Sequence, residues 1–449
     1  MIQKLLMAIL ILSSLEGNGQ TLVVRDPAIQ QMVVEVSADS LQQYISTLVS
    51  FGTRHTLSSV TDPKRGIGAA REWVVKKFRE FAKNSNGRLT AFVDTTTLLP
   101  DGKRVNKPVN LGNAMAILKG TDASDKRIFL ISGHLDNRVS DVMNINAETP
   151  GANDDGSGVA AVIECARVMS RRAFPATIIF VAVSGEEQGL LGAGYLAEKA
   201  KKENWDLQAV LNNDIMGSNH SNETGIIDNT RLRVFSEGLP AYELDKKAAG
   251  IRSLGTENDG PSRQLARYIK ETGERYVDHI EMVMIYRNDR FLRGGDHTPF
   301  VQHGFAAVRL TEMNENFEHQ HQDIRTENGI EFGDLTRFMD FEYLRKNTAV
   351  NLSCLANLAS SPKAPAEVTI DVKDLTNSTY INWKKPVTGN TYGYYILMRE
   401  TTAPQWQKKF FTKEHGMRLP YSKDNYFFAV QSVDEAGHES QAIPPVVGR

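Results

Sequence analysis

The sequence predicts an α/β protein with a mostly parallel central sheet flanked by helices, followed by a small all-β sandwich. Three observations lead to this prediction. Strand-like apolar runs alternate with helical stretches over residues 37–358. The central strands run directly into polar residues, as strands of open α/β sheets do at the edge where ligands bind. Residues 366–449 instead show short alternating strands, which are typical of a β-sandwich.

The centre of the predicted sheet is the stretch from Arg127 to Glu187 and the strand after it. It contains a strand at Arg127–Ser132, an apolar helix at Val159–Ser170 and a second strand at Ala176–Val183. A third strand, Leu207–Asn213, follows. Apolar runs of this kind are expected for strands that are buried on both faces.

Helices and strands on both sides of this centre complete the unit. Hydrophobic periodicity predicts helices at 37–51, 69–81, 240–249, 262–272 and 335–358, and strands at 89–98, 113–118, 281–286 and 304–310. The stretch 359–365 has the composition of a linker. We therefore expect a larger α/β domain over residues 20–360 and a smaller all-β domain over residues 361–449.

Composition narrows the range of functions. A hydrophobic content of 41% and a charged content of 24% are those of a globular protein. The net charge of −2 gives no electrostatic reason to expect nucleic acid or an anionic membrane as a partner. The two cysteines, Cys165 and Cys354, provide neither a disulfide framework nor a metal-type spacing, and we expect both to be buried small hydrophobes.

The N-terminus has the pattern of a secretory signal peptide over residues 1–19. Lys4 supplies a positive charge, Leu5–Leu15 is apolar, and Gly17 and Gly19 are small residues at the expected cleavage site. The other interpretation is a buried N-terminal helix. No cysteine follows to anchor a lipoprotein, and no later stretch is apolar enough to cross a membrane. We expect a secreted or periplasmic protein.

The C-terminal segment resembles a fibronectin type III module. The resemblance rests on Trp383 within its strand, the pair Tyr394–Tyr395, and the strand Tyr426–Val433 followed by Gly437. Further strands are predicted at 367–372, 379–383 and 392–399. Such modules are spacers or adhesion elements. The resemblance therefore implies contact with a surface, a polysaccharide or a protein, and no catalytic role.

Five nitrogen and oxygen donors follow the central strands or lie in the loops beyond them. They are His134, Asp154, Glu187, Asp214 and His297. This mixture without a thiolate suits zinc, and also cobalt or manganese. Five ligands are too many for one tetrahedral ion with an open position, but they suit two ions that share a carboxylate. Asp136 is placed to accept the other ring N–H of His134 and so fix its tautomer.

Each of these residues also has an ordinary structural explanation. Asp155 can simply cap the next helix, Gly185-Glu186-Glu187 can be a solvated loop, and a histidine before Thr-Pro can begin a helix. Their joint placement after consecutive strands favours a metal site. Two adjacent glutamates then need different roles: Glu187 can bind metal while Glu186 accepts a proton from the attacking water.

These motifs resemble the zinc peptidases of the M28 family, which contains bacterial leucyl-type aminopeptidases, glutamate carboxypeptidases and glutaminyl cyclases. The resemblance covers 36–358 and rests on Gly133–Asp136, Gly151–Gly158, Gly185–Glu187, Asn213–Gly217 and Asp296–Phe300. It implies that His134 and Asp214 hold one zinc ion, that Glu187 and His297 hold the other, and that Asp154 bridges them. It also implies Glu186 as general base, Asp136 as the partner of His134, and His319–Asp323 as structural support.

The resemblance implies a secreted exopeptidase with two zinc ions, an aminopeptidase that acts on peptides or proteins. Two alternatives stay open. A glutaminyl cyclase works with one zinc ion, and the joint retention of His134 and Asp214 argues against it. A catalytically dead binding or adhesion protein would have lost Glu186 or a ligand, and none is lost. Gly295 replaces the serine familiar at that point of the motif, and no tyrosine can be assigned to the oxyanion, with Tyr286 the nearest candidate.

Overall fold

The computed structural model describes residues 25–239, 250–373, 375–387 and 389–448. The predicted signal peptide, residues 1–19, and the helical stretch predicted at 240–249 lie outside the described residues. Within the described ranges, no helix combines the length and the apolar character that spanning a membrane requires.

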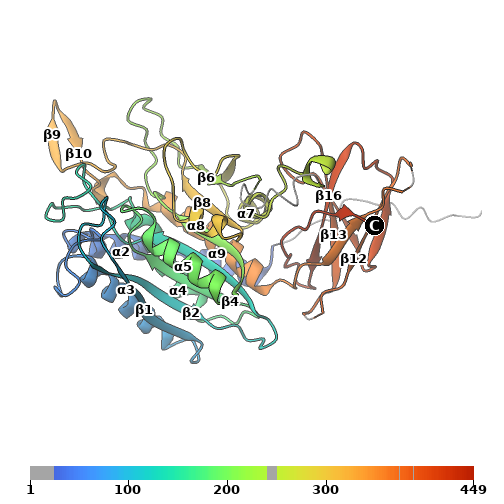
Figure 1. The fold of residues 1–449 in the computed structure, drawn as a ribbon, viewed down its shortest axis with the longest axis horizontal. Coiled ribbons are helices and arrows are strands. Elements are labelled where there is room, and N and C mark those ends of the chain that lie inside the picture. The colour runs from blue at the N-terminus through green and yellow to red at the C-terminus, as the bar shows by residue number, and fades with distance from the viewer. Residues whose placement is uncertain (1–24, 240–249, 374, 388, 449) are drawn as a thin grey trace, which may run out of the picture.

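An eight-stranded mixed sheet forms the centre of the larger unit, which confirms the predicted α/β class (Figure 1). Its strand order is β1-β2-β4-β3-β5-β8-β6-β7. The strands are β1 (Leu89–Leu98), β2 (Val109–Leu118), β3 (Arg127–His134), β4 (Thr177–Val183), β5 (Asp206–Asn213), β6 (Arg231–Phe235), β7 (Glu281–Ile285) and β8 (Ala307–Glu312). The four central strands β4, β3, β5 and β8 are parallel, whereas β2 and β6 pair with them antiparallel.

Helices cover both faces of this sheet. One face packs against α1 (Pro27–Val34), α2 (Ala38–Ser50), α3 (Ile67–Ala82), α4 (Gly156–Met169), α7 (Pro261–Tyr276) and α9 (Phe341–Ser360). The other face packs against α5 (Leu191–Lys202) and the short α8 (His297–Gln302). A 3₁₀ turn, η2 (Thr336–Phe338), precedes α9, and a hairpin of β9 (Arg325–Glu327) and β10 (Ile330–Phe332) projects from the body (Figure 1).

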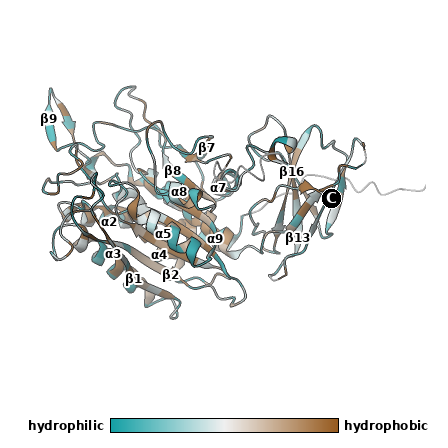
Figure 2. Cartoon of the chain, viewed as in Figure 1, coloured by the Kyte–Doolittle hydropathy of each residue, from teal (hydrophilic) through white to brown (hydrophobic). Residues whose placement is uncertain are grey.

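Side chains of the central strands alternate between the two cores. In β4, Ile178 and Phe180 point into the larger core, whereas Ile179 and Val181 point into the smaller one. This period of two on a strand buried on both faces accounts for the unbroken apolar run in the sequence. The central strands are correspondingly brown, the hydrophobic end of the scale, in Figure 2. The hydrophobic pattern of the sequence predicted these central strands. It did not predict β6, which has only five residues, two of them arginine.

The C-terminal segment folds into two small sheets, as predicted for an all-β unit. One sheet has the order β15-β12-β11-β17 and the other β14-β13-β16. The strands are β11 (Ala366–Ile370), β12 (Thr379–Lys384), β13 (Gly393–Glu400), β14 (Lys408–Thr412), β15 (Gly416–Leu419), β16 (Tyr426–Val433) and β17 (Val446–Val447). The rings of Trp383 and Tyr394, one from each sheet, pack edge to face at 5.1 Å. The fibronectin type III relationship itself stays a prediction.

Buried ion pairs attach this C-terminal unit to the helices of the larger one. Glu439 is 1% exposed and accepts two hydrogen bonds from Arg275 of α7, at 2.9 and 2.8 Å, and one from Asn357 of α9 at 3.1 Å. Arg399 of β13 pairs with buried Asp259 at 2.9 Å. In Figure 1 the small sheets lie beside α7 and α9. The unit is therefore docked by specific contacts and is not merely tethered by the linker.

Candidate metal centre

Three neighbouring parallel strands end at the same edge of the sheet and carry the predicted donors there. The register pairs His134, the last residue of β3, with Val183, the last residue of β4, so these two strand ends lie level. Glu186 and Glu187 follow β4, and Asp214 follows β5. A side chain on Gly133 would clash with the backbone of Gly158, so this glycine lets α4 approach β3 closely.

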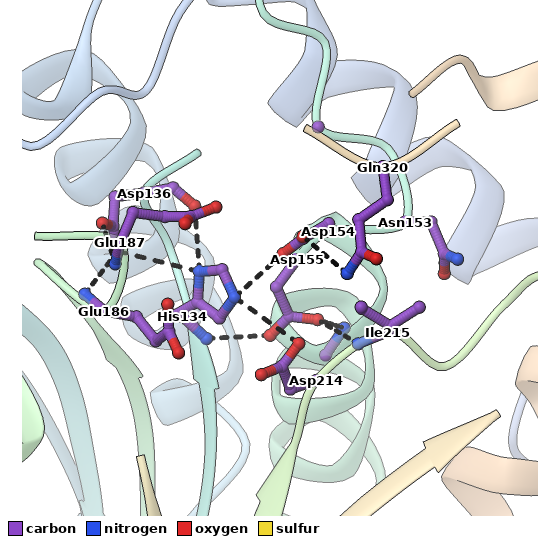
Figure 3. Close-up of polar contacts among 12 residues, drawn as sticks. His134, Asp136, Asn153, Asp154, Asp155, Glu186, Glu187, Asp214, Ile215 and Gln320 are labelled. Carbon is purple, nitrogen blue, oxygen red and sulfur yellow. Dashed lines mark hydrogen bonds and ion pairs between the residues drawn. The ribbon is translucent and has the colours of Figure 1, made fainter. Parts of the chain in front are cut away.

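The first donor group consists of His134, Asp154 and Asp214, all buried. Nε2 of His134 lies 3.1 Å from Oδ1 of Asp154 and 3.7 Å from Oδ1 of Asp214. Figure 3 shows both carboxylates converging on this ring nitrogen. The second donor group consists of Asp154, Glu187 and His321. Nε2 of His321 lies 2.9 Å from Oδ2 of Asp154 and 3.0 Å from Oε1 of Glu187. Asp154 thus offers one oxygen to each group.

The structure does not place His297 in either donor group. This histidine begins α8, and its Nε2 lies 2.8 Å from the carbonyl oxygen of Asn288. Its place in the second group is taken by His321, from the His319–Asp323 segment that was expected to be structural support. In the sequence, His297 stands out because it directly follows an aspartate after a glycine pair, whereas His321 lies in an irregular loop with a second histidine two residues away. The structure therefore brings His321, and not His297, beside Asp154 and Glu187.

Asp136 contacts His134 mainly through its backbone, whereas its carboxylate contacts other groups. Nδ1 of His134 lies 3.0 Å from the backbone oxygen of Asp136 and 3.7 Å from its carboxylate Oδ1. The carboxylate instead accepts hydrogen bonds from the backbone N–H groups of Glu186, at 3.2 Å, and Glu187, at 3.1 Å, and from the Thr56 hydroxyl at 2.7 Å. The backbone of Asp136 therefore orients the imidazole, and its side chain holds the turn that carries both glutamates.

Asp155 and Asp334 fix the loop that carries Asp154. Asp155 caps α4 by accepting from Gly158 N at 2.8 Å, and it also accepts from His134 N at 2.8 Å (Figure 3). Asp334 accepts from the backbone N–H of Asp154 at 2.7 Å and of Asn153 at 2.8 Å. The sequence suggested the capping role of Asp155. It gave no signal for Asp334, which approaches from 180 positions away.

The pKa values of the carboxyl groups differ with their neighbours. Burial opposes ionisation of Asp214, but the guanidinium of Arg309 and the His134 ring outweigh it and hold the pKa of that carboxyl below its ordinary value. Burial raises the pKa of Glu186 well above its usual range, and the negative charges of Glu187 and Asp214 add to the effect. Among the described residues, no donor contacts the carboxylate of Glu186. A carboxyl group with these properties is suited to accept and return a proton.

The donor chemistry fits a pair of divalent cations. Carboxylates crowded into a buried site repel one another unless cations compensate them. Oε1 of Glu187 is buried and accepts no hydrogen bond of good geometry, although Nε2 of His321 is 3.0 Å away. Two imidazoles and three carboxylates without a thiolate are ligands that zinc accepts, and the shared carboxylate of Asp154 matches a two-ion arrangement.

A pocket of about 420 Å³ opens over both donor groups. Glu186 also lines this pocket. Beyond the donors, the lining contains two leucines, Leu190 and Leu292, and four arginines, Arg104, Arg138, Arg290 and Arg293. The donors thus face a space large enough for part of a peptide, at the sheet edge where open α/β folds bind ligands.

Comparisons with known proteins agree with this description. The model of peptidase family M28 matches residues 113–340. A probable zinc metalloprotease of Leptosphaeria maculans is 43% identical over 433 residues, which cover 96% of this chain and 100% of the relative. A second, from Pyrenophora tritici-repentis, is 42% identical over 94% of this chain and 88% of its own length.

Among solved structures, the LapA aminopeptidase of Legionella pneumophila matches 76% of this chain and 78% of its own, with a TM-score of 0.52 and 18% identity. LapB of the same organism matches with a TM-score of 0.53 and 17% identity, over 75% of this chain and 76% of its own. These two likenesses concern the fold.

Proposed function

Because the chain belongs to peptidase family M28, we propose that it is a zinc-dependent exopeptidase that uses two metal ions and Glu186 as general base. The observation that carries the proposal is the pair of donor groups that share Asp154, next to a glutamate whose carboxylate has no partner among the described residues. The relatives named as zinc metalloproteases support zinc as the metal.

The proposed ligand sets are His134, Asp154 and Asp214 for one ion and Asp154, Glu187 and His321 for the other. Bound there, the ions would supply Lewis acidity that polarises the substrate carbonyl and makes water a stronger acid. His134 is oriented by the backbone of Asp136, and Asp154 is held by Asp334. These contacts fix the ligands before substrate arrives, and such supporting contacts matter for metal affinity.

Glu186 would do the proton transfers. Its carboxylate accepts the proton of the attacking water as the C–O bond to the peptide carbonyl forms. The same carboxyl group then returns that proton to the leaving amine as the C–N bond breaks. Burial raises the pKa of Glu186 well above its usual range, which makes its carboxylate a stronger base than that of an exposed glutamate.

An aminopeptidase mode and secretion are the finer parts of the proposal. The first follows from the resemblance of the motifs, and the fold shared with LapA is compatible with it. The second depends on the signal-like pattern of residues 1–19. The fibronectin type III-like module at 361–449 is kept as a proposed unit, although its buried contacts with α7 and α9 favour a structural role over a free adhesion arm.

Metal analysis combined with a substrate panel tests the proposal. We expect two zinc ions per chain, hydrolysis of aminoacyl anilides, loss of activity on chelation and its recovery with added zinc. N-acylated anilides should be poor substrates if a free amine is needed. Full activity after exhaustive chelation would refute the metal mechanism. Cyclisation of N-terminal glutamine without anilide hydrolysis would instead favour a glutaminyl cyclase.

A further inference from the structure

The active-site pocket is cationic outside its metal donors and Glu186. The carboxylates that line it are Asp154, Glu187, Asp214 and Glu186, all already assigned to the metal ions or to proton transfer. The remaining charged residues of the lining are all arginines. A substrate group that extends beyond the metal donors therefore meets positive charge, which favours an anion and disfavours a second cation.

Two of these four arginines form ion pairs with acidic side chains. Arg138 lies 2.9 Å from Oε2 of Glu187. Arg290 lies 2.5 Å from Oε2 of Glu315 and 3.2 Å from Oδ1 of Asp289. These ion pairs hold both side chains in place, so their donors are less available to a ligand than those of the other two arginines.

The other two arginines, Arg104 and Arg293, have no acidic partner among the described residues. Nη1 of Arg104 donates to the backbone oxygen of Glu187 at 2.6 Å, which holds this side chain next to a proposed metal ligand while leaving its charge uncompensated. Arg293 is exposed, and in the described part of the chain no acceptor contacts its side chain. They come from separate loops, 99–108 between β1 and β2 and 286–296 between β7 and α8. Within the described ranges, the pocket thus has two guanidinium groups that lack an acidic partner.

We propose that Arg104 and Arg293 bind a carboxylate of the peptide substrate close to the scissile bond. A guanidinium offers paired N–H donors that match the two oxygens of a carboxylate, and such charge-assisted hydrogen bonds are stronger than neutral ones. The inference rests on the proposed peptidase function and adds the substrate class. Leu190 and Leu292 line the same pocket and provide apolar contact for the side chain that accompanies the carboxylate.

Two groups of a peptide present this chemistry: the α-carboxylate of a short peptide and the side chain of Asp or Glu. Two matched substrate pairs distinguish them. Leucyl-leucine is compared with leucyl-leucine amide, and leucyl-glutamate amide with leucyl-glutamine amide. We expect kcat/KM to be higher for the charged member of at least one pair, on the order of 10-fold for one charge-assisted hydrogen bond. The pair that shows the preference identifies the source.

Variants test whether the two arginines cause the preference. In Arg104→Met and Arg293→Met, and more so in the double variant, the ratio of kcat/KM within the responsive pair should fall toward one. Arg287→Met is the matched control, because Arg287 lies in the same loop as Arg293 but stacks on Phe291 and does not line the pocket. Its ratio should equal that of the unmodified protein. Because each ratio is measured within one preparation, partial misfolding of a variant does not mimic the effect.

Binding gives a second readout that does not depend on turnover. Leucine should inhibit more strongly than leucinamide if the α-carboxylate is the bound group, and the double variant should lose this difference. Equal kcat/KM within both substrate pairs, or a preference that survives in the double variant, would overturn the inference. Failure to hydrolyse any of the four peptides, or hydrolysis that persists after chelation, would instead refute the proposed function.

Discussion

The guanidinium of Arg309 lies 3.0 Å from Oδ2 of Asp214, while the other oxygen of that carboxylate faces Nε2 of His134 at 3.7 Å. Arg309 is completely buried in β8. It also lies 3.2 Å from Oδ2 of Asp289 and donates to the backbone oxygen of Gly294 at 3.0 Å. Arg309 thus forms an ion pair with the Asp214 oxygen that points away from His134. It also holds the loop that carries Arg293.

Replacing Arg309 with Met should weaken metal binding. Without its ion pair, Asp214 loses the contact that fixes its orientation and lowers its pKa. Loss of such a supporting contact typically costs about 10–100-fold in metal affinity. Zinc titration against a competing chelator measures this. Arg309→Lys keeps the charge but not the fork of donors, and we expect an intermediate affinity. Unchanged affinity in a folded Arg309→Met protein would contradict the positioning role.

Glu186→Gln should retain both metal ions but lose turnover. The amide keeps the shape of the side chain but cannot accept the proton of the attacking water, and general base catalysis contributes roughly 10²–10⁴-fold. The measurements are kcat on an aminoacyl anilide and the zinc content of the same sample. Activity within a few-fold of the unmodified protein would reject Glu186 as the base.

Substitutions of His321 and His297 test which of the two histidines is a metal ligand. The structure favours His321, whereas the sequence predicted His297. His321→Ala should lower the zinc content from two ions toward one, because Nε2 of His321 faces both Asp154 and Glu187. His297→Ala should leave two ions bound and affect stability, because that ring contacts the carbonyl of Asn288 in a buried position. The reverse result would restore His297 as the ligand.

Asp154→Asn should reduce the metal content more than any substitution of a ligand in one group alone. Asp154 offers one oxygen to each donor group, so the loss of its charge affects both ions. Metal analysis after gel filtration checks this. A variant that still holds two ions with unchanged affinity would argue against a bridging carboxylate.

Glu439→Gln should destabilise the whole chain. It leaves Arg275 and Lys409 without their buried partner, and breaking a buried ion pair in this way costs about 3–5 kcal/mol. Urea or thermal unfolding measures the loss. The matched control is Glu367→Gln, which breaks the exposed pair of Glu367 with Lys384 in the same unit and should cost at most about 1 kcal/mol.

The same residue predicts an acid limit to stability. Although burial alone would raise the pKa of Glu439, Lys409 and Arg275 lower it from 4.5 to about 2. A carboxyl group with a depressed folded-state pKa contributes its full stability above pH 4.5, and the contribution disappears as pH falls toward 2. The free energy of unfolding should therefore fall with acid over this window, and less steeply in Glu439→Gln. Equal slopes for both proteins would contradict the assignment.

Local pattern in the sequence determined the strands of the sheet centre and the polar residues that end them. The apolar runs of β3, β4 and β5 are buried on both faces, so their composition alone identifies them. Because neighbouring parallel strands end at one edge, the order of residues along the chain is enough to expect His134, Glu187 and Asp214 together.

Only the tertiary structure decided the contacts that join distant segments. His321, Asp334 and Arg309 reach the site from loops or a strand far along the chain, and no local periodicity indicates where such side chains point. The same holds for Glu439, whose buried pairing docks the C-terminal sheets. Hydrophobic patterning records which face of an element is buried. It does not record which polar groups meet when elements pack, because that depends on the three-dimensional path of the loops between them.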